Sequence, residues 1–192
     1  HRASVEGAAT VVGDRCYLMT NSHVAHDCVL ENEVTLVSGA LLEGHVQVGR
    51  KAIISGNTGV DQFVRIGELA IIGGVAMISQ DIPPFTTTDH QGAVVGLNSV
   101  GLMRDGFTSS DRDEMKNLFR IIYRSGMSFQ RAVELASELA VTDAGKRFVA
   151  FFNSDSRRGV RRIRDRRSRS ELPGKMSQNP DEQNPLQGPG RK

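Results

Sequence analysis

Aliphatic residues recur at every sixth position between residues 12 and 78, and this period constrains the fold more than any other feature of the chain. The positions are Val12, Leu18, Val24, Leu30, Leu36, Leu42, Val48, Ile54, Val60, Ile66, Ile72 and Ile78. A small or aliphatic residue also follows four positions after each of them. Hexads of this kind are typical of a parallel β-helix, in which each hexad forms one flat face and three hexads complete a triangular coil.

The length of one coil, 18 residues, predicts which side chains lie above one another. Successive coils stack at the strand spacing of about 4.8 Å, so each side chain lies over the residue 18 positions later. We therefore expect His26, Gly44 and Gln62 to form one column along an edge of the prism. His45 adjoins Gly44 and Asp61 adjoins Gln62, so both belong to the same patch.

The stretch NSHVAHDC (21–28) brings His23 to the same corner, and three interpretations of the cluster are open. An outward histidine on a β-helix can be merely solvated. Imidazole is also a common zinc ligand, although no third ligand with closed geometry is evident beside His23 and His26. In the third interpretation His26 is a general base, Asp27 or Asp61 orients its ring, and the Gly44 N–H stabilises an oxyanion. That set of groups suits acyl transfer to an alcohol.

The aliphatic period stops at DIPPF (81–85), where two prolines remove ladder donors. A helical period then appears in residues 108–124, 127–140 and 142–153, with Ser110 and Ser128 as candidate N-caps of the first two segments. We therefore divide the chain into a partial β-helix with a connector (1–102), an α-helical region (103–156) and a basic, disordered tail (157–192).

The charge is unevenly distributed: residues 157–192 contain 11 Lys or Arg and 4 Asp or Glu, whereas the whole chain has a net charge of only +2. The tail is either a solvated appendage or a patch that attracts an acidic carrier protein or the anionic inner membrane surface. Nucleic-acid binding is disfavoured because aromatic residues are not interleaved. The two cysteines, Cys16 and Cys28, form no CxxC motif, which favours a reducing cytoplasm. No apolar run has the length of a membrane span.

Several motifs at nearly constant spacing resemble the UDP-N-acetylglucosamine O-acyltransferase family, whose members catalyse the first step of lipid A biosynthesis. The motifs are NSHVAHDC, EGHVQVG, VDQF, DIPPF, GLNSVGLMRDGF and IIYRSG, within residues 1–162. The resemblance implies a homotrimer of left-handed parallel β-helices with active sites between subunits. It also implies transfer of a (3R)-3-hydroxyacyl chain from acyl carrier protein to the 3-hydroxyl of UDP-N-acetylglucosamine. No cofactor is expected beyond the carrier protein's phosphopantetheine arm.

By position, the resemblance assigns His26 as the base, Asp27 as its neighbour and Gly44 as the oxyanion donor. It assigns Gly74 to the gauge of acyl-chain length. The remaining expected substrate contacts are His23, His45, Asp61, Gln62 and Arg104.

The chain departs from the family in two ways: Asp61 stands where a histidine is usual, and the first several coils are not in this sequence. The chain opens on His1, which suggests a fragment or a processed start. Two alternatives therefore stay open, a non-catalytic scaffold derived from the family and a zinc-dependent protein resembling γ-carbonic anhydrases.

Overall fold

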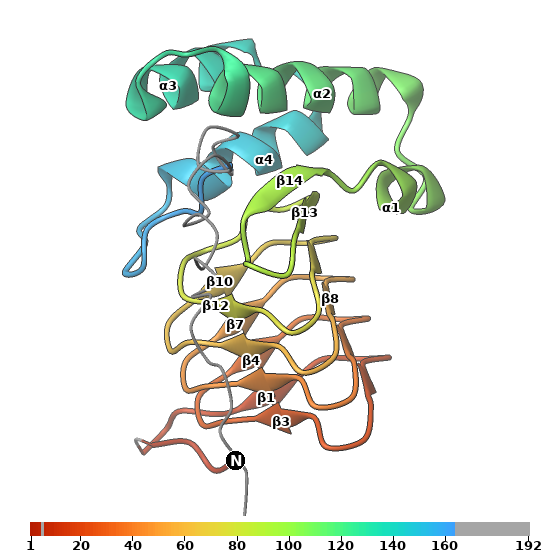
Figure 1. Cartoon of the computed structure of the whole chain (residues 1–192), viewed down its shortest axis with the longest axis vertical. Coiled ribbons are helices and arrows are strands. Elements are labelled where there is room, and N and C mark those ends of the chain that lie inside the picture. Colours follow the sequence, from red (N-terminus) through yellow and green to blue (C-terminus); the bar gives the residue numbers. More distant parts are fainter. Residues whose placement is uncertain (5, 164–192) are drawn as a thin grey trace, which may run out of the picture.

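The protein is a left-handed parallel β-helix of about four coils followed by a small group of helices, as Figure 1 shows. The computed structural model describes residues 1–4 and 6–163. Within them, the solenoid strands are β1 (Val11–Val12), β2 (Tyr17–Leu18), β3 (His23–Val24), β4 (Val29–Leu30), β5 (Thr35–Leu36), β6 (Leu41–Leu42), β7 (Gln47–Val48), β8 (Ile53–Ile54), β9 (Gly59–Val60), β10 (Arg65–Ile66), β11 (Ile71–Ile72) and β12 (Met77–Ile78).

The strands form three sheets, one for each side of the prism. Sheet A contains β1, β4, β7 and β10, and sheet C contains β3, β6, β9 and β12. Sheet B contains β2, β5, β8 and β11 and is extended by β13 (Thr86–Thr88) and β14 (Val94–Leu97). The pairing is parallel and in an 18-residue register, for example Leu30 with Val48. The predicted coil length is thereby confirmed.

The second residue of each strand points inward and fills the core. Leu36, Leu42 and Ile54 are completely buried, and the small residues Ala40 and Ala52 occupy the spaces at the corners. Apolar burial of this kind contributes about 25 cal/mol per Å². The aliphatic period of the sequence is therefore the core of the solenoid.

The corners require a left-handed backbone, and the chain meets this requirement mostly without glycine. Asp27, His45 and Phe63 have φ values of 58°, 61° and 65° at equivalent places of successive coils. A left-handed conformation costs an L-residue roughly 1–2 kcal/mol. The ladder hydrogen bonds on both sides of each corner hold the backbone in place, for example His45 N–H to the His26 carbonyl at 3.0 Å.

The ladder continues a little beyond the predicted stop at DIPPF. The prolines donate no hydrogen bond, but the N–H groups on either side of them do. Ile82 donates to Arg65 O at 2.9 Å, and Phe85 donates to Glu68 O at 2.8 Å. β13 then pairs in parallel with β11, and β14 closes the sheet antiparallel to β13.

Four helices follow: α1 (Ser99–Arg104), α2 (Ser109–Arg124), α3 (Phe129–Leu139) and α4 (Asp143–Asn153). They enclose a second core that includes Phe85, Leu118 and Phe148. Ser128 caps α3 as predicted, but the N-cap of α2 is Thr108 and not Ser110. No helix in the described ranges is long and apolar enough to span a bilayer.

The cap of α2 lies two residues earlier than predicted because Thr108 completes a reciprocal capping box. Its hydroxyl accepts a bond from Asp111 N–H, and the Asp111 carboxylate accepts one from Thr108 N–H at 2.8 Å. Ser110, two positions later, already belongs to the helix.

The beginning of the basic tail differs from the prediction that the chain is disordered from residue 157. Residues 157–163 lie along the solenoid: Val160 bridges Asp81, and Ile163 bridges Val94. The physical reason is the unpaired backbone at the top of the ladder, which accepts this segment. The remainder of the predicted tail, and with it the proposed attraction to a membrane surface, lies outside the described residues.

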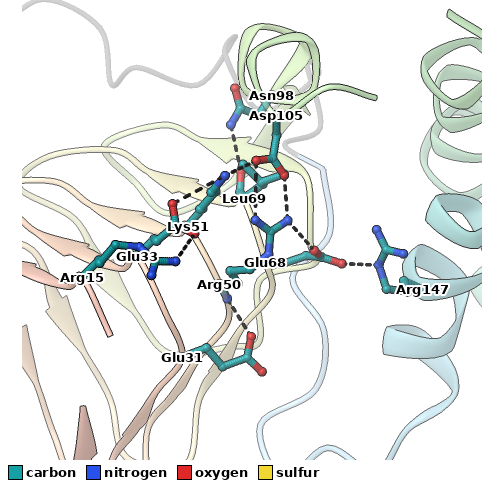
Figure 2. Close-up of polar contacts among 10 residues, drawn as sticks. All are labelled: Arg15, Glu31, Glu33, Arg50, Lys51, Glu68, Leu69, Asn98, Asp105 and Arg147. Atoms are coloured by element: carbon teal, nitrogen blue, oxygen red, sulfur yellow. Dashed lines mark hydrogen bonds and ion pairs between the residues drawn. The ribbon is translucent and has the colours of Figure 1, made fainter. Parts of the chain in front are cut away.

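A cluster of charged residues joins the corner between sheets A and B to the helical region (Figure 2). Asp105, directly after α1, accepts hydrogen bonds from Arg50, at 2.6 Å, and from Lys51. Glu68 accepts from Arg147 of α4 at 2.6 Å. The Asp105 side chain is only 9% exposed. This carboxylate therefore anchors the end of α1 on the solenoid, while Asn98 at its start donates to the Leu69 carbonyl at 2.8 Å.

Replacement of Asp105 by Asn should lower the free energy of unfolding by about 1–2 kcal/mol, because Arg50 and Lys51 each lose one ionic partner and keep only a longer pair, at 3.6 Å, with Glu68 and Glu33. Burial opposes ionisation of Asp105, but bonds from Arg50 and Lys51 outweigh it and lower the pKa of its carboxyl. The stabilisation should therefore be complete above pH 4 to 5 and be lost as the pH falls through the lowered pKa. Denaturant unfolding at several pH values measures both effects.

Asp113→Asn is the matched control, since Asp113 pairs with Lys116 at 2.9 Å on a face where both side chains are more than half exposed. Its effect on the free energy of unfolding should be small, because solvent screens this exposed ion pair. Equal stability of the Asp105→Asn and Asp113→Asn variants would contradict the anchoring role.

Candidate active site

The turns that follow β3, β6 and β9 (residues 25–28, 43–46 and 61–64) lie above one another and form one edge of the prism, here called the histidine corner. The parallel pairing of Val24 with Leu42, and of Leu42 with Val60, sets their register. The expected column of His26, Gly44 and Gln62 is therefore present in the structure.

The imidazole of His26 lies directly against the backbone of Gly44. A Cβ built on Gly44 would be 2.5 Å from Cε1 and 2.7 Å from Nε2 of His26, far inside van der Waals contact. The His26 ring can therefore occupy this position only because residue 44 is a glycine, and the backbone torsion of Gly44 plays no part. The arrangement places a basic nitrogen beside an unobstructed backbone segment.

Asp27 holds the other ring nitrogen of His26. Its Oδ2 is 2.8 Å from His26 Nδ1 and also accepts bonds from Ser4 N–H at 3.1 Å and Ser4 Oγ at 2.5 Å. The hydroxyl of Ser4, followed by His26, lowers the pKa of Asp27 to about 2. Asp27 is therefore an ionised acceptor at neutral pH, and His26 Nδ1 carries the proton while Nε2 is free to accept one.

His45 is the second histidine of the cluster. Its Nε2 is 3.7 Å from Asp27 Oδ2, and its ring lies edge-on to His26 at 5.2 Å between centroids. The His45 ring also stacks on Phe63 at 4.6 Å between centroids, with the ring planes only 9° apart. The two histidines thus share one carboxylate, and an aromatic ring fixes the second of them.

His23 is not part of this contact network, although the sequence predicts it near the same corner. It lies on β3, in register with Leu41, and its ring contacts that of His1 at 4.6 Å. Among the described residues, the structure therefore joins two of the three predicted histidines and leaves His23 beside them on the face of sheet C.

Asp61 and Gln62 are held by the segment that follows α4. Arg158 approaches the Asp61 carboxylate at 3.7 Å and donates from Nε to the Gln62 carbonyl at 2.6 Å. Gln62 N–H also donates to Glu43 at 3.2 Å. The acidic residue at position 61 therefore has a cationic partner.

Gly74 and Arg104 lie elsewhere in the chain. Gly74 is at the corner between sheets B and C, above Gly56, and a Cβ there would make ordinary contacts of 3.4 Å and more. Arg104 belongs to α1 and lines a groove of about 260 Å³ beside Ile53 and Ile71 of sheet B. No contact in the described residues joins either of them to His26.

One donor atom from each of His26, Asp27 and His45 lies within 4.8 Å of the others, a spacing that could hold a metal ion. The donor set fits such an ion poorly. The Asp27 oxygen already accepts bonds from His26 and Ser4, which a metal would have to displace. The hydrogen-bonded arrangement suits proton transfer better than ligation.

A family model described as "Udp N-acetylglucosamine O-acyltransferase; Domain 2" matches residues 81–161. An acyl-[acyl-carrier-protein]--UDP-N-acetylglucosamine O-acyltransferase of Synechocystis is 41% identical over 176 residues, 91% of this chain and 61% of that protein. A relative from Gloeothece citriformis with the same name is 45% identical over 135 residues, 70% of this chain and 49% of that protein.

Solved structures of enzymes with this name also resemble the chain. The UDP-N-acetylglucosamine acyltransferase of Francisella novicida superposes with a TM-score of 0.77 at 35% identity, over 82% of this chain and 58% of that one. The UDP-N-acetylglucosamine acyltransferase of Arabidopsis superposes with a TM-score of 0.78 at 31% identity, over 83% of this chain and 59% of that one. The chain belongs to the UDP-N-acetylglucosamine O-acyltransferase family. It spans about half to three fifths of the length of these curated relatives.

Four residues that contact the histidine corner were not predicted from the sequence. Sequence reasoning missed Ser4, Phe63, Arg157 and Arg158. The 18-residue spacing from His45 could have found Phe63. The other three lie in segments without a repeat, and no pattern in the sequence indicates their contacts.

Replacement of Gly44 by Ala should displace the His26 ring, because the new methyl group would overlap it. The NMR resonances of the His26 ring should shift, while the unfolding temperature should fall only slightly, since the ring moves on an exposed edge. Gly74→Ala, whose Cβ has room, is the control and should leave the His26 resonances unchanged. An unshifted His26 ring in Gly44→Ala would disprove the close contact.

Proposed function

We propose that the chain catalyses transfer of a (3R)-3-hydroxyacyl group from acyl carrier protein to the 3-hydroxyl of UDP-N-acetylglucosamine, the first step of lipid A biosynthesis. The observation that carries the proposal is the His26 ring, held by ionised Asp27 on one side and lying against Gly44 on the other. The relatives' names support the substrates.

In the proposed reaction, His26 Nε2 accepts the proton of the sugar hydroxyl as its oxygen attacks the thioester carbonyl. The new C–O bond produces a tetrahedral oxyanion, which the Gly44 N–H stabilises. The C–S bond then breaks, and the phosphopantetheine thiolate leaves with the proton from the imidazolium. Asp27 keeps its negative charge throughout and stabilises the imidazolium, because its pKa of about 2 lies far below neutral pH.

The other parts of the proposal concern the setting of this reaction. Thioester chemistry needs no cofactor beyond the carrier protein's own arm. A cytoplasmic location follows from the two substrates, a nucleotide sugar and a carrier protein. Arg104 and Gly74, which are remote from His26 within one chain, would reach it only from a neighbouring copy. We therefore include a homotrimer with sites between subunits.

An apolar surface on sheet C supports this assembly. Met77 is 67% exposed and lies over Gly59, where a Cβ would be only 2.9 Å from its sulfur. Leu41 and Val75 are exposed on the same side, at 49% and 76%. Sheet C ends at the histidine corner, so a partner on this surface would lie beside His26.

Light scattering should give the mass of a trimer at micromolar concentration. Val75→Lys should shift the population toward monomers, because a desolvated charge would enter the interface. Val141→Lys is the matched control, since Val141 is equally exposed, at 75%, but lies in the helical region after α3. A stable wild-type monomer would contradict the trimeric assembly.

His26→Ala should lower kcat by about 10²–10⁴, the usual contribution of a general base. Folding should be nearly unaffected, since the His26 side chain is 39% exposed. His23→Ala should mainly raise KM, because His23 is assigned to binding and lies outside the proton-transfer pair. Acyl transfer from carrier protein, measured by product formation, separates the two.

The wild-type protein, His26→Ala and a further variant, His45→Ala, distinguish the alternatives. Wild-type protein without turnover would favour a non-catalytic scaffold. Stoichiometric zinc that is lost in both His26→Ala and His45→Ala would favour a metal site. A near-normal kcat in His26→Ala would remove the general base from the proposal.

A further inference from the structure

The segment after α4 turns back toward the solenoid and passes beside the histidine corner at Arg157 and Arg158, and Ile163 then bridges Val94 of β14. Its backbone continues the ladder: Asp81 N–H donates to the Gly159 carbonyl at 2.9 Å, and Arg161 N–H donates to Asp81 O at 2.8 Å. Residues 154–163, here called the C-terminal arm, appear in Figure 1 as the blue end of the coloured chain beside the strands. The arm is therefore fixed by main-chain bonds and not only by its charges.

Arg157 of the arm extends the stack of rings at the histidine corner. Its guanidinium lies over the Phe63 ring at 4.6 Å from the centroid, and Phe63 is parallel to His45. A guanidinium stacks favourably on an aromatic face. Its N–H groups lie in its own plane, so stacking leaves them free to donate. The column thus runs from His26 through His45 and Phe63 to a cation.

The charge of Arg157 is not neutralised within the described part of the chain. There, no carboxylate lies within ion-pair distance of it, and its side chain belongs to an exposed residue. The nearby acid, Asp61, pairs with Arg158 at 3.7 Å. Arg158 therefore cancels the local negative charge, and Arg157 remains as a positive group at one end of the candidate site.

We infer that Arg157 binds a phosphate group of a substrate that occupies the histidine corner. The inference rests on the proposed function and adds a binding residue to it. A planar guanidinium is well matched to phosphate oxygens, and stacking on Phe63 reduces the ordering required when they bind. Two rings separate Arg157 from His26, so it meets a part of the substrate that is remote from the reacting carbonyl.

Two phosphates have this chemistry, the diphosphate of the nucleotide sugar and the phosphate of the phosphopantetheine arm. Calorimetric titration of the full chain with three probes distinguishes them: UDP-N-acetylglucosamine, 3-hydroxyacyl-phosphopantetheine and 3-hydroxyacyl-pantetheine. Arg157→Gln should weaken binding of one phosphate-bearing probe roughly tenfold and leave acyl-pantetheine unchanged. Arg157→Lys should recover part of the loss, because it keeps the charge but not the planar stack.

Arg162→Gln is the matched control, because Arg162 belongs to the same arm but lies over Phe129 of α3 at 5.3 Å. It should bind all three probes like wild type. The loss in Arg157→Gln should also shrink as ionic strength rises from about 0.05 M to about 0.5 M.

The outcomes separate this inference from the proposed function. Weaker binding of UDP-N-acetylglucosamine identifies the diphosphate, and weaker binding of acyl-phosphopantetheine identifies the arm. Unchanged affinity for both, or an equal loss for acyl-pantetheine, overturns the phosphate site. Phosphate-dependent binding without acyl transfer would support the phosphate site and contradict the proposed function. Acyl transfer by the wild type, with unchanged probe affinities in Arg157→Gln, would support the function and contradict the phosphate site.

Discussion

The parallel stacking of residues 18 positions apart is the constraint on which the rest of the molecule depends. Each coil contributes two-residue strands that are too short to be stable alone, and they persist because both neighbouring coils pair with them. The inward Leu30 and Val48 are buried only because they repeat at this spacing. The same register places His26 over Gly44, so the candidate chemistry is a consequence of the core spacing.

The sequence predicted the periodic part of the molecule because a repeat converts separation along the chain into position in space. His26, Gly44 and Gln62 could be aligned from their spacing alone. Residues outside the repeat could not be placed in this way. Ser4, which binds Asp27, and Arg157, which lies over Phe63, reach the histidine corner through segments that have no period.

The ends of the repeat were harder to predict for a related reason. Prolines in DIPPF mark a loss of donors, yet Ile82 and Phe85 still donate to the coil below. The top of a solenoid also presents unpaired backbone groups, which Gly159 and Arg161 satisfy from the far end of the chain. Composition alone suggested a solvated tail from residue 157, whereas backbone pairing holds Gly159, Arg161 and Ile163 against the rest of the chain.

The corner between sheets B and C shows what the left-handed turns demand of a sequence. Asn21, Gly39 and Asn57 occupy equivalent places in three coils, and these residue types accept a positive φ readily. Val75 follows in the fourth coil with a φ of 58°, although β-branched residues are rare in this conformation. Its side chain is also 76% exposed in the single chain, so it gains little from burial there. A sequence optimised for the single chain would carry asparagine or glycine at this position, and the proposed trimer would give Val75 the burial that its own chain does not provide.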